Sequence, residues 1–97
     1  MLTGKQKRYL RSLGSVLEPV VHVGKAGVDD AVVRSVAEVL TARELVKVRT
    51  LHNCPLEPQE VLSLLAGETG AHLVQTIGRN GLLYKRNSEK PKLELPT

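Results

Sequence analysis

The clearest structural signal in this 97-residue chain is the stretch Val20-Val21-His22-Val23-Gly24-Lys25-Ala26-Gly27, which is followed by a helical pattern that starts near Asp29. The valine-rich residues 20–23 predict a short buried strand that ends at the glycines. Asp29 is a residue type that caps helices, and the apolar side chains after it recur at helical spacing. A strand, a tight glycine loop and a helix in succession predict an α/β unit.

The loop at residues 24–27 has the composition of an anion-binding turn. Gly24 and Gly27 can take backbone angles closed to other residues and let a bulky anion approach the main chain, while Lys25 adds a positive charge. The start of the following helix adds unpaired amide groups, whereas Asp29 and Asp30 oppose a phosphate close to the helix end, so net attraction requires Lys25 and the more distant basic residues. GxxG loops clamp nucleotide backbone in some RNA-binding modules, but the same spacing also marks ordinary turns. The candidate contacts are Gly24, Lys25, Ala26 and Gly27.

Local signals predict the remaining elements. Thr3 and Gln6 form a capping-box pattern ahead of leucines at helical spacing, which predicts a helix over residues 3–14. Strands are expected at 20–23, 45–49, 72–77 and 82–86, and a third helix from Pro58 to residue 67 or 70. Asn80-Gly81 predicts a type I′ hairpin turn between the last two strands. The polar residues 87–97 are expected to run along the surface, with a short edge pairing at 93–95.

This order of elements predicts the fold class. Helix, strand, helix, strand, helix, strand, strand indicates an α/β two-layer sandwich of about four mixed strands, with helices mainly on one face. The length and the 41% hydrophobic content suit one domain over residues 1–97, with residues 87–97 as a polar tail. Alternation over residues 45–49 directs Lys47 and Arg49 to an open face of the sheet.

The charge distribution favours a polyanionic partner. The net charge is +4, and residues 1–25 and 79–97 carry +4 and +3 whereas residues 26–78 sum to −3. A fold that brings both ends near the glycine loop would gather positive charge on one side. A solvated surface with basic tails is the alternative. The candidate cationic contacts are Lys7, Arg8, Arg11, Lys47, Arg49, Arg79, Lys85 and Arg86.

Other functional classes find little support in the residues. The single cysteine, Cys54, excludes an internal disulfide, and its pairing with His52 is too sparse for a zinc site, so Cys54 is expected to be a loop or small core thiol. We find no catalytic constellation, and we expect no enzyme activity, no cofactor and no metal. No stretch has the length of a signal peptide or a membrane span, which predicts a cytoplasmic protein without a membrane partner. Tyr9 and Tyr84 are too few to stack bases unless they converge, so recognition of RNA backbone and shape fits better.

Several ordered blocks of the sequence carry a family resemblance. They are residues 2–11, 17–28, 44–49, 69–71, 74–79 and 82–86. With these blocks the chain resembles the CRM domain, named for chloroplast RNA splicing and ribosome maturation, in its bacterial stand-alone YhbY-like form. The resemblance implies an α/β domain similar to the C-terminal domain of translation initiation factor 3, with RNA bound through the GxxG loop and adjacent basic surface. Ala26 stands where the family has asparagine, and the second GxxG at residues 78–81 is not part of the family motif.

The family also implies a biological role. Its bacterial members look like assembly factors associated with precursors of the large ribosomal subunit, and its plant relatives act in intron splicing. The leading hypothesis is therefore a monomeric, non-enzymatic protein that binds large-subunit ribosomal RNA or its precursor particle. Two alternatives stay open: a module that docks mainly on a ribosomal protein, and a small enzyme that uses the loop as a phosphate site.

Overall fold

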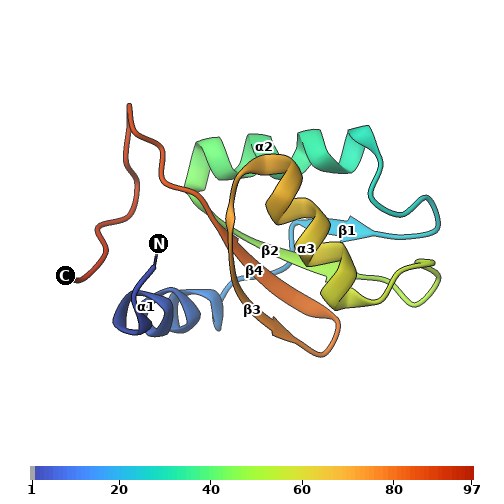
Figure 1. Cartoon of the computed structure of the whole chain (residues 1–97), viewed down its shortest axis with the longest axis horizontal. Coiled ribbons are helices and arrows are strands. Elements are labelled where there is room, and N and C mark those ends of the chain that lie inside the picture. The colour runs from blue at the N-terminus through green and yellow to red at the C-terminus, as the bar shows by residue number, and fades with distance from the viewer. Residues whose placement is uncertain (1) are drawn as a thin grey trace.

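The structure, a computed structural model, describes residues 2–97 and shows three helices and four strands there (Figure 1). In chain order they are α1 (Gly4–Gly14), β1 (Val21–Val23), α2 (Asp30–Arg43), β2 (Leu45–Thr50), α3 (Pro58–Thr69), β3 (His72–Ile77) and β4 (Asn80–Tyr84). None of the helices within residues 2–97 is long and apolar enough to cross a lipid bilayer. Every helix and strand predicted within residues 3–86 is present, and its bounds agree with the prediction to within two residues.

The strands form one mixed sheet in the order β1-β2-β4-β3. β1 pairs parallel to β2, with Val21 opposite Val48, and the other neighbouring strands are antiparallel. A parallel pair needs a long crossover, and α2 provides it. The predicted α/β fold with four mixed strands is confirmed.

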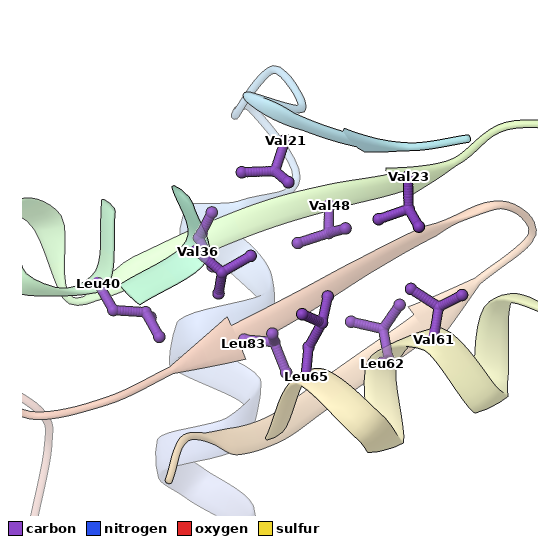
Figure 2. Packing of buried hydrophobic residues seen from close by; sticks show 10 residues of the cluster. Val21, Val23, Val36, Leu40, Val48, Val61, Leu62, Leu65 and Leu83 are labelled. Atoms are coloured by element: carbon purple, nitrogen blue, oxygen red, sulfur yellow. The ribbon is translucent and has the colours of Figure 1, made fainter. Parts of the chain in front are cut away.

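Both faces of the sheet carry packed side chains. α2 and α3 cover one face, over a core that Figure 2 shows between them and the strands. Its buried residues are Val21, Val23, Val36, Leu40, Val46, Val48, Val61, Leu62, Leu65 and Leu83. α1 and the C-terminal segment cover part of the other face, around buried Leu10, Leu45, Val74, Leu82 and Tyr84. Two of the three helices thus share a face, as predicted, and α1 lies across the opposite one.

The helix ends follow the capping signals of the sequence. The hydroxyl of Thr3 accepts from the Gln6 amide at 3.1 Å, and the Gln6 side chain accepts from the Thr3 amide at 3.0 Å. Asp29 Oδ1 accepts from the Val32 amide at 2.9 Å at the start of α2. Pro58 opens α3, and Gly70 closes it in the left-handed conformation. These local hydrogen bonds explain why the helix positions could be predicted.

The hairpin turn lies two residues earlier than predicted. Ile77 pairs with Asn80, so the turn is Gly78-Arg79, with Gly78 at φ +57°. Asn80 and Gly81 belong to β4 instead, and the predicted turn at these residues is wrong. Gly81 is buried there under α3, where a Cβ atom would lie 2.5 Å from Leu62 Cγ. The glycine serves the close approach of a helix rather than a turn.

Substitution of Gly81 by alanine is expected to destabilise the protein by about 1–3 kcal/mol, because Leu62 is fully buried and has no space to move. Gly67→Ala is the matched control. Its Cβ would meet nothing within 4 Å, and alanine favours the helix by about 0.5–1 kcal/mol. The free energy of unfolding from urea titrations checks both. Equal stability of the two variants would contradict the packing argument.

A buried glutamate pins the C-terminal segment. Glu44 is 0% exposed, and its carboxylate accepts backbone hydrogen bonds from Asn87 at 2.5 Å and from Lys92 and Leu93 at 2.6 Å each. Leu93 and Leu95 pack against the cluster under α1. The predicted edge pairing at residues 93–95 is therefore wrong, because this segment forms no strand and instead closes the α1 face with its leucines.

The environment of Glu44 makes stability depend on pH. Burial raises the pKa of Glu44, whereas the three backbone donors and the nearby Arg86 guanidinium lower it, and the net pKa lies below its usual 4.5. A carboxyl with a lowered folded-state pKa contributes stability that is complete above its unfolded pKa. That contribution is lost as the pH falls through the folded-state pKa.

Glu44→Gln is expected to cost about 1–3 kcal/mol at neutral pH, because the amide group replaces an acceptor with a donor facing backbone N–H groups. The difference in free energy of unfolding between the variant and the unmodified protein should stay constant down to about pH 5 and become smaller below it. Urea titrations across this pH range measure it. Glu38→Gln, at an exposed site on α2, is the control. If the difference for Glu44→Gln did not depend on pH, the lowered pKa of Glu44 would not contribute to stability.

Candidate functional site

Three loops meet at one end of the sheet, which we call the loop end. They are residues 24–27 after β1, residues 51–57 after β2, and the β3–β4 turn at residues 78–79. The Leu51 amide donates to the Val23 carbonyl at 2.8 Å, which joins the first two loops. The Arg79 guanidinium donates to the carbonyls of Thr50 at 2.8 Å and Leu51 at 3.0 Å, which joins the second and third. Segments far apart in sequence thus form one surface.

Residues 24–27, which we call the GKAG turn, form a tight turn with its tip in solvent. The Gly27 amide donates to the Gly24 carbonyl at 2.9 Å, and Lys25 and Ala26 at the tip are exposed. Gly27 has φ +69°, a left-handed conformation that residues other than glycine rarely adopt. Within residues 2–97 we find no hydrogen bond from the amides of Lys25 and Ala26. The tip therefore offers two main-chain donors and one ammonium group to an anion.

The start of α2 carries the two acidic side chains that the sequence places against an anion there. Asp29 already caps the Val32 amide, and Asp30 places a second carboxylate in the first turn. These acids oppose a phosphate at the helix end itself. The capacity of this site to hold an anion therefore lies mainly in the turn and in Lys25.

The loop after β2 forms the wall beside the turn, and sequence reasoning assigned it no function. A Cβ on Gly24 would lie 3.3 Å from the Asn53 side-chain oxygen, so the Asn53 carboxamide lies against the turn. His52 and Asn53 are exposed, while Cys54 is half-buried against the core, as predicted for a loop or small core thiol. No local signal could place Asn53 beside Gly24, because only the parallel pairing of β1 and β2 brings the two loops together.

Three of the predicted cationic contacts bind carbonyl groups within the fold. Lys47 Nζ donates to the carbonyls of Gly14 at 3.1 Å and Leu17 at 3.2 Å, which ties the end of α1 to the sheet. Lys85 Nζ donates to the Thr69 carbonyl at 2.7 Å, at the end of α3. Arg79 joins two loops, as described above. These side chains have structural roles that their positions in the sequence did not indicate.

Of the other predicted cations, Arg11 lies in the last turn of α1 and lines a pocket with Lys47 and Asn80, and the rest divide between the two ends of the molecule. Lys7 and Arg8 lie on α1 and Arg86 follows β4, on the side of both chain termini and away from the β1–α2 loop (Figure 1). The molecule is 39 Å long in this direction. The fold therefore does not bring the basic chain ends to the GKAG turn, while Arg49, exposed near the end of β2, does lie at the loop end.

The two tyrosines do not form a stacking surface. Tyr9 is 36% exposed on α1, whereas Tyr84 is 2% exposed and stacks on His72 at a centroid distance of 6.4 Å. Burial raises the pKa of Tyr84, and the nearby Glu44 carboxylate raises it further. The condition under which the two rings could serve as a platform for bases is not met.

A mixed sheet with a glycine turn between a strand and a helix, beside a second exposed loop, defines a small α/β protein of the GxxG-loop class. The chain belongs to the CRS1/YhbY (CRM) domain family, whose model matches residues 2–85. The predicted family is thereby confirmed.

The relatives and a solved structure agree with this assignment. The “Probable RNA-binding protein YqeI” of Bacillus subtilis is 48% identical over 96 residues, which is 99% of this chain and 100% of that protein. An “RNA-binding protein” of Haemophilus influenzae is 37% identical, over 98% of this chain and 95% of its own. The solution structure of the hypothetical protein SAV1595 from Staphylococcus aureus superposes with a TM-score of 0.81 at 40% identity, over 99% of this chain and 100% of that one.

Proposed function

We propose that this protein is a non-enzymatic RNA-binding protein that acts in the cytoplasm, as a monomer, on precursors of the large ribosomal subunit. The observation that carries the proposal is the GKAG turn, whose exposed tip presents main-chain amides and Lys25 at the loop end. RNA phosphates are the anions that such turns hold in GxxG modules. The names of the two bacterial relatives support RNA as the partner.

The two ends of the molecule would make different contacts. At the loop end, Gly24 and the buried Gly27, which has φ +69°, shape the turn so that a phosphate can approach its tip, and Lys25 and Arg49 supply charge. At the opposite end Lys7, Arg8 and Arg86 form a second group that fits the phosphates of the same RNA farther along its backbone. Phosphate contacts of this kind set position and orientation rather than sequence.

The assembly role rests on the family. CRM proteins of this form look like factors of large-subunit assembly, and folded precursor RNA suits a protein that contacts phosphates at two separated places. A catalytic role has no support in the site, because the residues around the turn offer no nucleophile paired with a base.

Replacing Lys25 with glutamate is expected to weaken binding to a large-subunit ribosomal RNA transcript about tenfold or more, because it removes one ionic contact and adds repulsion. The slope of log affinity against log salt concentration should become shallower by about one. Lys90→Glu, at an exposed site in the C-terminal segment, changes the net charge equally and is the control. Filter binding at several salt concentrations measures both variants.

Crosslinking in cells with sequencing of the attached RNA identifies the target. The unmodified protein should enrich large-subunit ribosomal RNA and its precursors, and Lys25→Glu and Arg8→Glu, tested separately, should each reduce the enrichment. Enrichment of other transcripts would contradict the assembly role. Binding in vitro that is unchanged by Lys25→Glu would exclude the turn from the contact.

A second candidate function, docking on a ribosomal protein, is favoured by one apolar surface. Val16 is 82% exposed and Val20 is 46% exposed, in the segment between α1 and β1. They border an open pocket of about 260 Å³ whose other apolar lining residues are Leu13, Leu17, Leu45, Val46 and Leu93. An exposed valine beside an apolar pocket fits a small hydrophobic anchor of a partner protein.

If this surface docks on a protein, Val16→Asp should reduce co-sedimentation with large-subunit precursor particles at least severalfold. Its affinity for protein-free ribosomal RNA should not change. Leu64→Asp, at a 46% exposed site on α3, is the matched control. Normal co-sedimentation of Val16→Asp would exclude this surface from docking on the particle.

A further inference from the structure

Four side chains form a row across all four strands near the loop end. The strand register pairs His22 with Arg49, Arg49 with Asn80, and Asn80 with Ile77. Neighbouring strands are about 4.8 Å apart, so the row spans about 15 Å. His22 and Arg49 are exposed, and Ile77 is 63% exposed. Three of the four side chains in the row are therefore exposed, and Asn80 is half-buried.

The alternation of the strands places this row on the face opposite α2 and α3. Val21, Val23 and Val48, which flank His22 and Arg49, are buried in the core under those two helices. Lys47, on the same side of β2 as Arg49, donates to carbonyls at the end of α1. The row therefore lies on the α1 face of the sheet.

α1 stops one step short of the row. Its last residue, Gly14, comes so close to the sheet that a Cβ there would lie 2.3 Å from Leu82 Cδ1. Leu82 lies two residues along β4 from Asn80, so Asn80 is the next side chain on this face toward the loop end. The helix covers the face as far as Leu82 and leaves His22, Arg49 and Ile77 exposed, while Asn80 is half-buried and its Oδ1 atom is buried without a hydrogen-bond partner within residues 2–97.

An open pocket of about 260 Å³ lies between the end of α1 and the row. Its polar lining comes from Arg11, Ser15, Lys47, Gln75 and Asn80, and its apolar lining comes from Ile77 and Leu82. None of the lining residues, all within residues 2–97, is acidic. Exposed apolar surface at Ile77, carboxamide groups and positive charge together match the chemistry of a nucleobase and its phosphate.

We propose that this row and pocket form a stacking platform for unpaired nucleotides of the bound RNA. The inference rests on the proposed function, and it adds a second mode of recognition to the GKAG turn. The His22 ring and the Arg49 guanidinium plane each stack a base, and the Gln75 carboxamide faces a base edge in the pocket. His22 precedes Gly24 by two residues, so an RNA strand held at the turn continues directly onto the row.

The platform requires unpaired bases. A base in a duplex is already stacked on its neighbours and does not lie flat on a side chain, whereas a single-stranded segment exposes the faces of its bases. Stacking also depends on a planar group, so lysine cannot replace Arg49 although it preserves the charge. These two requirements separate stacking from simple phosphate attraction.

The experiment compares two probes: a short blunt RNA hairpin, and the same hairpin with a single-stranded extension of about six uridines. His22→Ala and Arg49→Lys are each expected to weaken binding of the extended hairpin about 5- to 50-fold and to leave the blunt hairpin within about twofold. His22→Phe, which preserves a flat ring, should bind the extended hairpin like the unmodified protein. Arg34→Lys, at an exposed site on α2, is the control.

The outcomes distinguish the platform from the turn. Equal losses for both probes would show that the row contacts phosphates only and would overturn the platform, as would failure of His22→Phe to restore binding. Lys25→Glu should weaken binding of both probes. If it weakens both while the row variants weaken neither, the proposed function stands and the platform is wrong. If Lys25→Glu weakens neither probe and the row variants weaken only the extended one, the platform stands and the role of the turn is wrong.

Discussion

The parallel pairing of β1 with β2 determines how the other elements of this fold are arranged. Parallel neighbours require the chain to return along the sheet, and α2 makes that return. Both strands therefore end at the loop end of the sheet, and the loops that follow them lie side by side. Because β4 is antiparallel to β2, the β3–β4 turn also lies at the loop end. The three loops of the candidate site are neighbours because of this topology, before any side chain is considered.

The length and placement of α1 determine which part of the opposite face stays open. Its 11 residues span about 16 Å, and the close approach at Gly14 brings its end onto Leu82. Lys47 fixes that end by donating to two carbonyls, and the leucines of the C-terminal segment close the face on the far side. The close contact at Gly14 and the hydrogen bonds of Lys47 therefore determine where α1 stops covering the sheet. The hydrogen bonds of Glu44 hold the C-terminal segment over the other part of this face.

Features with local causes could be predicted from the sequence, and features with distant causes could not. The capping box at Thr3, the cap at Asp29 and the proline at the start of α3 each act within one turn of helix, so the helices were predicted well. The hairpin turn was misplaced because Gly81 is required by the close packing of Leu62, a residue of α3, and not by a turn. The burial of Glu44 was missed for the same reason, since its partners lie more than forty residues away.

The same distinction governs the basic residues of the candidate site. A charge count treats all 14 lysines and arginines alike, but Lys47, Arg79 and Lys85 bind carbonyls whose positions only the fold reveals. The turn at residues 24–27 could be predicted because its glycines, its lysine and its place between strand and helix are contiguous in the sequence. A surface such as the row from His22 to Ile77 has no contiguous signal, since each strand contributes one residue to it. Recognition by main-chain geometry is therefore visible in a sequence, whereas recognition by a sheet surface depends on strand register.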